Sequence, residues 1–284
     1  MNQVMIANLM VSLSQTEKLQ EGLVRHMVLN SLLNYRSEFK KKYGEFVLCY
    51  DNRHYWRRDE FPHYKGTRKR DREKSKHNWD NIFELLNKLK AEFLEHLPYK
   101  VVEVDGAEAD DIIAVLCKQQ GLANIRLQNN MQPPVKTLIL SGDKDFIQLQ
   151  KYPNVKQWSP ITKKDVNGFD PTIYLKEHIL KGDTSDGVPN VLSPDNTFVD
   201  GLRQRPLSRK KIQSWLLGGG SDWNDEVKRN FQRNSTLIDL SRTPEELKNQ
   251  IRLEYNNAPH GLSLIHISEP TRRRGISYAV FCLK

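Results

Sequence analysis

The chain has 284 residues, of which 38% are hydrophobic, enough for one large domain or two small ones around a core. A mean hydropathy of −0.67, without a signal-peptide pattern or an apolar stretch long enough to span a bilayer, argues against any membrane partner. The net charge of +9 favours a polyanionic partner such as a nucleic acid. The three cysteines, Cys49, Cys117 and Cys282, lack metal-site spacing and are typical of reduced thiols in a cytoplasmic protein.

Apolar spacing predicts alternating helices and strands in the first 170 residues. We expect strands at 46–50, 101–104, 137–140 and 155–158 and helices within 4–42, 81–96, 107–119 and 146–150. This alternation is typical of an α/β fold with a central, mostly parallel sheet flanked by helices. After about residue 170 the pattern becomes helical, with helices expected at 172–180, 208–217, 225–231 and 245–253.

The last segment of the chain does not continue this pattern. Residues 262–284 resemble no protein family and look like the translation of a sequencing-library adapter, so we set them aside from the expected fold. The alternative is a genuine amphipathic tail.

Acidic side chains follow several of the apolar runs. In open α/β sheets, sites form where strands end, so we expect these carboxylates to meet in one cleft. They would repel one another there, and a divalent cation with oxygen ligands, Mg²⁺ or Mn²⁺, would relieve the repulsion. The helix dipole explains one or two acids at a helix start, but not three acidic strand ends. The candidate metal ligands are Asp51, Glu108, Asp110, Asp111, Asp143, Asp145, Asp183 and Asp186. Asp111 has an alternative role, as a helix cap or as a support for the ligands.

A basic segment with interleaved aromatic residues spans 53–77. Its cations can neutralise phosphates and its aromatic rings can stack on unpaired bases, although a solvated charged loop would have a similar composition. An acidic, metal-binding cleft in a basic chain favours a metal-dependent nuclease.

The motifs resemble those of the 5′-nuclease superfamily, the flap endonucleases and 5′–3′ exonucleases, and within it a phage type of ribonuclease H. The resemblance runs from about Asn2 to Asn257. It implies a PIN-like catalytic domain at 1–170 with an arch at about 53–80, and a helical DNA-binding domain with a helix–turn–helix element at 171–261. The motifs that carry it are Phe46–Asn52, Tyr55–Asp59, Glu108–Asp111, Asp143–Phe146, Lys151–Pro160 and Ile179–Asp183.

The resemblance also implies how the acids are shared between two metal ions. Asp51, Glu108 and Asp110 would hold the first ion, and Asp143 and Asp145, with either Asp183 or Asp186, the second. Two such ions activate a water molecule and stabilise the leaving oxygen, which here means phosphodiester hydrolysis that leaves a 5′-phosphate.

Positive groups are expected above this site. Tyr64-Lys65-Gly66-Thr67-Arg68 is similar to the Tyr-Lys-x-Asn-Arg element of the family's arch, although Thr67 replaces the usual asparagine. Lys65 and Arg68 are therefore the candidate catalytic cations. The turn at 181–190 is implied to hold duplex DNA, with K⁺ as a further ion, although it resembles an ordinary Gly-Pro turn as well. The candidate DNA contacts are Arg57, Arg58, Tyr64, Lys69, Arg70, Gly182, Gly187, Arg209, Lys210 and Lys211.

The implied function is removal of RNA primers and 5′ flaps during viral DNA replication, in the host-cell cytoplasm. The expected partners are 5′-flap or nicked DNA and RNA–DNA hybrids, together with a single-strand-binding protein and a sliding clamp, for a monomeric enzyme.

Two other functions remain open. The family begins with an aspartate on a first strand. In one register Asn2-Gln3-Val4 matches the stretch just after this aspartate, and in another register Ala7 takes its place. The chain would then be a weak nuclease or a non-catalytic DNA-binding relative that lacks its first strand. A sugar-phosphate hydrolase would share the acidic cleft but would not need the basic segment.

Overall fold

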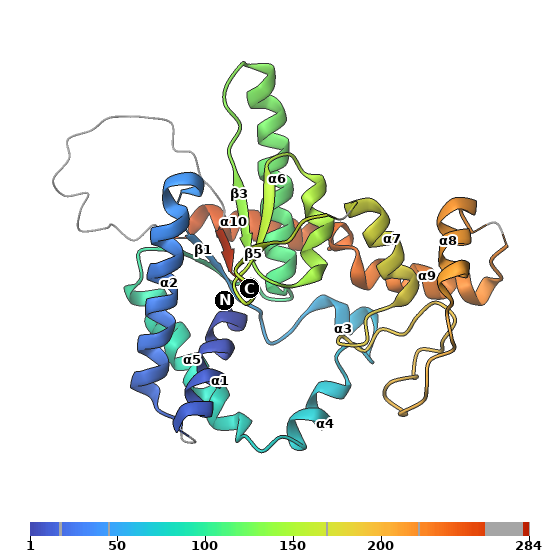
Figure 1. Cartoon of the computed structure of the whole chain (residues 1–284), viewed down its shortest axis with the longest axis horizontal. Helices are drawn as coiled ribbons and strands as arrows, with labels where there is room; N and C mark the ends of the chain where they lie inside the picture. The colour runs from blue at the N-terminus through green and yellow to red at the C-terminus, as the bar shows by residue number, and fades with distance from the viewer. Residues whose placement is uncertain (17–18, 45, 169, 221, 259–280, 284) are drawn as a thin grey trace.

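The computed structural model describes residues 1–16, 19–44, 46–168, 170–220, 222–258 and 281–283. Its centre is a six-stranded sheet in the order β2-β1-β6-β3-β4-β5 (Figure 1). Four of the five strand pairs are parallel and only β4 and β5 are antiparallel, which confirms the predicted mostly parallel α/β sheet. The strands are β1 (Phe46–Cys49), β2 (Lys100–Val102), β3 (Thr137–Leu140), β4 (Val155–Ser159), β5 (Lys164–Asp165) and β6 (Phe281–Leu283).

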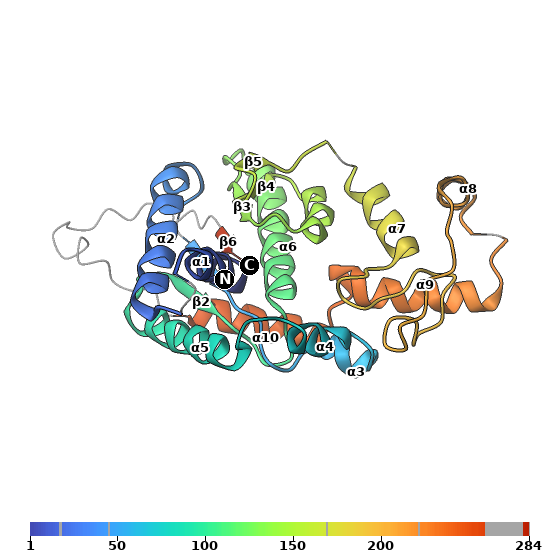
Figure 2. The same cartoon turned by 60° about the horizontal axis from the view of Figure 1, so that its bottom comes forward.

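The central strands are apolar along their whole length because helices cover both faces of the sheet. On one face, Phe46 and Leu48 of β1 and Leu138 and Leu140 of β3 pack against α1 (Asn2–Thr16), α2 (Glu21–Tyr43) and α5 (Trp79–His96). On the other face, Val47, Cys49 and Ile139 pack against α6 (Ala109–Asn129) and α10 (Glu245–Asn257). Figure 2 shows the two helical layers on either side of the sheet.

Several elements differ in extent from the sequence prediction. The helical stretch expected at 4–42 forms two helices, α1 and α2, and α6 continues to Asn129, beyond the helix expected at 107–119. The helix expected near 146–150 is the 3-10 helix η1 (Lys144–Lys151), which begins where the Asp143 side chain accepts a hydrogen bond from the Asp145 amide.

Residues 281–283, which the sequence analysis set aside with the rest of the tail, lie in the sheet. They form β6, which pairs with β1 on one side and β3 on the other. A position between two parallel strands offers backbone donors and acceptors on both sides, and the apolar run Phe281–Leu283 can satisfy them. Residues 262–280, also assigned to the tail, lie outside the described part of the chain.

The basic segment forms a connection between the sheet and α5. It contains two short helices, α3 (Trp56–Glu60) and α4 (Thr67–Glu73), which lie along one side of the molecule (Figure 1). Among the described residues, no helix has the length and apolar character needed to cross a membrane.

The second half of the chain is helical, as predicted. It contains α7 (Pro171–Lys181), α8 (Arg209–Gly218), α9 (Asp225–Ile238) and the 3-10 helix η2 (Leu240–Arg242). Two buried asparagines on α9 attach it to the loop that follows α7. Asn230 donates hydrogen bonds to the carbonyls of Val191 and Ser193, and Asn234 donates to those of Ile179 and Pro189. These bonds fix the turn that carries the last two predicted acids.

We predict that Asn234→Ala destabilises the protein. The Nδ2 group of Asn234 lies 2.8 Å from the carbonyl oxygen of Ile179 and 2.9 Å from that of Pro189, and its removal takes a buried donor away from both. The Pro189 carbonyl keeps a second donor, Nη2 of Arg233 at 2.9 Å. The free energy of unfolding in urea should fall by about 1–3 kcal/mol. The exposed neighbour Gln232→Ala is the matched control and should change it by less than about 0.5 kcal/mol. Equal effects of the two substitutions would contradict this role.

Candidate metal centre

The predicted acids converge at the carboxyl end of the parallel strands. Asp110 lies in the first turn of α6, Asp143 and Asp145 follow β3, and Asp183 follows α7. Oxygen atoms of Asp110, Asp143 and Asp145 lie within 4.8 Å of one another. A small pocket is lined by Asp110, Asp145, Asp183 and Asp186, so the aspartates that follow α7 join the group from the sheet.

Asp51 is attached to the same edge. It follows β1, and its Oδ1 accepts a hydrogen bond of 2.9 Å from the amide of Ala109 at the start of α6. This bond ties the end of β1 to the helix turn that carries Asp110. Asp51 therefore anchors the start of α6, but it is not among the aspartates whose oxygens lie within 4.8 Å of one another.

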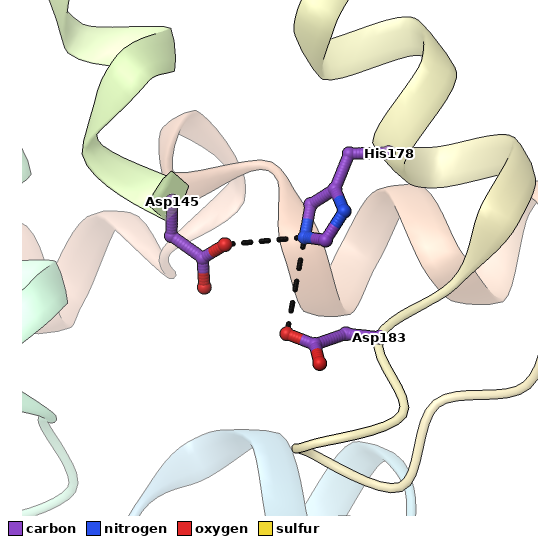
Figure 3. Close-up of side chains that lie close together, drawn as sticks. All are labelled: Asp145, His178 and Asp183. Carbon is purple, nitrogen blue, oxygen red and sulfur yellow. Dashed lines mark ion pairs between the residues drawn. The ribbon is translucent and has the colours of Figure 1, made fainter. Parts of the chain in front are cut away.

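His178 joins the acids, although the sequence prediction missed it. Its Nε2 lies 3.1 Å from Oδ1 of Asp145 and 3.8 Å from Oδ2 of Asp183. Figure 3 shows the three side chains turned toward one another from η1, α7 and the turn that follows α7. The only sequence signal was a histidine five residues before Asp183, because its approach to Asp145 depends on how α7 packs against η1.

Crowding changes the ionisation of these groups. Burial raises the pKa of Asp183, and the nearby carboxylates of Asp186 and Asp145 raise it further. Burial would lower the pKa of His178, but the adjacent carboxylate of Asp145, together with the charges of Asp183 and Asp143, outweighs it, so the pKa is raised. The carboxylates in this cluster repel one another when they are ionised. Divalent metal ions bound to their oxygen atoms would relieve this repulsion, so the cluster fits such ions.

Two predicted catalytic cations lie against these acids. The Lys65 ammonium contacts Oε1 of Glu108 and lies 3.6 Å from Oδ2 of Asp186, and Arg68 Nη2 lies 2.5 Å from Oδ1 of Asp186. Burial would lower the pKa of Lys65, but the charges of Asp186 and Glu108 raise it, so the ammonium stays protonated. Lys65 has a left-handed backbone (φ 56°), and its amide donates a 2.8 Å hydrogen bond to the carbonyl of Asp186. The basic segment is thus joined to the turn after α7.

Three predicted site residues are buried and paired within the protein. Arg57 is only 1% exposed; it pairs with Glu108 and Asp111 at 2.9 and 2.8 Å and donates to the carbonyl of Leu237. Tyr64 is 3% exposed, and its hydroxyl lies 3.0 Å from Glu108 and 2.7 Å from Asp186. For both residues this burial favours a supporting role over direct contact with DNA.

Asp111 is the third of these residues. It is fully buried, and its oxygens accept hydrogen bonds from Arg57, Trp56 and Thr243. Its carboxylate also accepts from the Glu108 amide and completes a capping box at the start of α6. These contacts favour the alternative role, a support for the ligands, which stays a prediction.

The remaining predicted DNA contacts lie on the surface or in the turn. Gly182 has a left-handed backbone (φ 69°), and a Cβ there would come within 2.4 Å of the Val188 carbonyl, so only glycine fits. Gly187 also has a positive φ, and its amide donates to the Thr184 carbonyl. The side chain of Lys69 lies outside the described residues. The exposed candidates are Arg58, Arg70, Arg209, Lys210 and Lys211.

Comparison with known proteins identifies the class. A model of the family described as 5′-3′ exonuclease, N-terminal resolvase-like domain, matches residues 7–178. The chain therefore belongs to the 5′-3′ exonuclease family, as its motifs indicated. It is 34% identical to Ribonuclease H of Enterobacteria phage T4 over 272 residues, which cover 90% of this chain and 84% of that protein. Neither match bears out the expected impairment of the chain or favours a non-catalytic relative.

Solved structures agree on the fold. A bacteriophage T5 flap endonuclease, in a complex with DNA and metal ions, gives a TM-score of 0.54 at 15% identity, over 82% of this chain and 89% of that one. A T5 5′-exonuclease with bound zinc gives 0.51 at 16% identity, over 81% and 90%.

We predict that the buried Arg57–Asp111 pair makes stability depend on pH. Burial raises the pKa of Asp111, but Arg57 lowers it more, so the folded value lies below the usual 3.8. The ionised pair therefore stabilises the fold fully above pH 3.8, and this stabilisation is lost as the pH falls through the folded pKa of Asp111. Asp111→Asn should lower the free energy of unfolding by about 3–5 kcal/mol at neutral pH.

The measurement is urea unfolding from neutral pH down to about pH 3, with the exposed Glu84→Gln on α5 as the control. The difference between wild type and Asp111→Asn should shrink toward low pH. A difference that stays constant over this range would contradict the role of the ionised pair.

Proposed function

We propose that the chain is a structure-specific, metal-dependent 5′ nuclease that hydrolyses phosphodiester bonds in 5′-flap or nicked DNA and in RNA–DNA hybrids. The observation that carries the proposal is the cluster of Asp110, Asp143, Asp145 and Asp183 beneath the two cations Lys65 and Arg68. Membership of the 5′-3′ exonuclease family and the likeness to the phage T4 protein named Ribonuclease H support it.

The acids are proposed to hold two divalent ions. Asp51, Glu108 and Asp110 would hold the first ion, and Asp143, Asp145 and Asp183 the second, with Asp186 at the border between them. Bound ions supply an activated water and stabilise the charge on the leaving oxygen. Mg²⁺ is the proposed ion, with Mn²⁺ as the alternative, because the ligand set is dominated by oxygen.

The chain's own residues position and stabilise the substrate. Lys65 and Arg68 neutralise the charge that develops on the scissile phosphate, for which they exchange their present contacts with Glu108 and Asp186. Arg57 remains buried and keeps Glu108 in place. Tyr64, between Glu108 and Asp186, keeps these two carboxylates at a fixed separation.

Further parts of the expected function stay predictions. They are the K⁺ ion at the 181–190 turn, the single-strand-binding protein and the sliding clamp as partners, the monomeric state, and action in the host-cell cytoplasm.

Cleavage of a 5′-labelled flap substrate tests the proposed function. With Mg²⁺ or Mn²⁺ the wild type should release a product with a 5′-phosphate, and Asp145→Asn should not, although it should still bind the flap. Binding without cleavage by the wild type would favour a non-catalytic DNA-binding protein. A wild type that neither binds nor cleaves the flap but hydrolyses sugar phosphates would favour the alternative of a sugar-phosphate hydrolase.

We predict that Lys65→Ala slows the chemical step. Loss of one buried positive group over the developing charge should lower the single-turnover rate of flap cleavage by about 10²–10³-fold. The dissociation constant for the flap, measured with Ca²⁺, should change much less. Lys136→Ala is the control, because Lys136 is exposed just before β3, at the opposite end of that strand. An unchanged single-turnover rate would rule out the proposed role of Lys65.

We predict that α8 contacts duplex phosphates. Arg209 and Lys210 are exposed in its first turn. Each phosphate contact contributes about 0.9 to the slope with which the logarithm of the DNA affinity falls as the logarithm of the salt concentration rises. The double variant Arg209→Ala/Lys210→Ala should therefore lower this slope by about 1–2 without changing the single-turnover rate. Lys41→Ala/Lys42→Ala, at the end of α2, is the control with the same change in charge. An equal loss of slope in both variants would mean that the effect reflects net charge only.

A further inference from the structure

A nitrogen ligand stands among the predicted oxygen ligands. His178 Nε2 lies 3.1 and 3.8 Å from oxygens of Asp145 and Asp183, and the three ligand atoms fall within 4.8 Å of one another. In an octahedral shell with bonds of about 2.1 Å, neighbouring ligand atoms lie about 3 Å apart. The arrangement therefore has nearly the spacing that a single ion requires (Figure 3).

The imidazole is held in this place by its surroundings. The Nε2 atom is shielded from solvent and directed at the two carboxylates, and the side chain is 19% exposed. The Tyr174 ring, one turn earlier on α7, stacks on the imidazole with ring centres 6.0 Å apart. The helix begins at Asp170, whose side chain accepts from the amides of Thr172 and Ile173, and it ends at Gly182. A ligand held in this way requires little rearrangement to bind an ion.

We propose that His178 supplies an imidazole nitrogen to the ion held by Asp145 and Asp183, so that this site prefers a first-row transition ion to Mg²⁺. Imidazole is a good ligand for such ions, whereas Mg²⁺ favours oxygen ligands and water. The proposal deepens the proposed nuclease function, since it concerns the second ion of that site and rests on its assignment. It assigns a mixed nitrogen and oxygen ligand set to the ion between η1 and α7.

The competing role for His178 is that of a counterion only. A protonated imidazole would then compensate the two carboxylates without contacting an ion. His178→Lys separates the two roles, because lysine keeps a positive group on α7 but offers no imidazole. His178→Ala removes both.

Electron spin echo spectroscopy of bound Mn²⁺ tests the proposal directly. The wild type, with one Mn²⁺ equivalent or two, should show modulation from a coordinated ¹⁴N nucleus, and labelling with ¹⁵N-histidine should convert it to the ¹⁵N pattern. The signal should vanish in His178→Ala and in His178→Lys. His54→Ala is the matched control, because His54 forms a similar pair with Asp59 at 3.0 Å on the exposed surface. This variant should keep the full signal.

Calorimetric titration gives a second readout. The dissociation constant for Mn²⁺ should rise by at least about tenfold in His178→Ala, because even loss of a group that only supports a ligand typically costs that much, while the constant for Mg²⁺ should change little. An equal loss of affinity for both ions would overturn the proposed preference.

Two spectroscopic results would overturn the nitrogen ligand itself. The first is the absence of histidine modulation in the labelled wild type, an experiment that does not depend on whether a variant folds. The second is survival of the modulation in His178→Ala. Flap cleavage by the same samples keeps the proposals apart. Cleavage without a nitrogen signal would contradict only the proposed role of His178 as a ligand. A nitrogen signal without cleavage would contradict only the proposed nuclease function.

Discussion

Electrostatic repulsion between the converging carboxylates is the constraint around which the molecule is organised. The charge of Glu108 is balanced in two ways. Arg57, buried and bound also to Asp111 and the Leu237 carbonyl, is a permanent counterion that cannot leave without exposing an unpaired charge. Lys65 approaches from the basic segment, and in the proposed function it exchanges this partner for a phosphate. Under that proposal the first cation maintains the site and the second acts on the substrate.

The positions of most acids could be predicted from the sequence because they follow directly from chain order. Strands such as β1 and β3 are short apolar runs, and residues just after them must lie at the same edge of a parallel sheet. Asp51, Asp143 and Asp145 therefore fall where this rule puts them. The turn at Gly182 was also predictable, because few residues other than glycine can adopt its backbone conformation.

Other features depend on contacts between distant parts of the chain, which leave little trace in local sequence. Arg57 and Tyr64 lie in a segment rich in charge, and only the partners at 108, 111 and 186 explain why they are buried. His178 has no distinctive signal in the sequence, because its approach to Asp145 depends on how α7 packs beside η1. Likewise, the insertion of β6 between β1 and β3 follows from the open backbone groups of those two strands, not from any local pattern.

The long loop between Asn190 and Ser208 has a consequence for how the chain responds to a break. A protease that cleaved it near the exposed Leu202 would separate the chain into two fragments. The contacts that cross the break are many: Arg57 with the Leu237 carbonyl, Gln148 with Ile238 and Leu240, and Lys100 with the Tyr255 carbonyl. The nicked protein should therefore remain associated and migrate as one species until it is denatured.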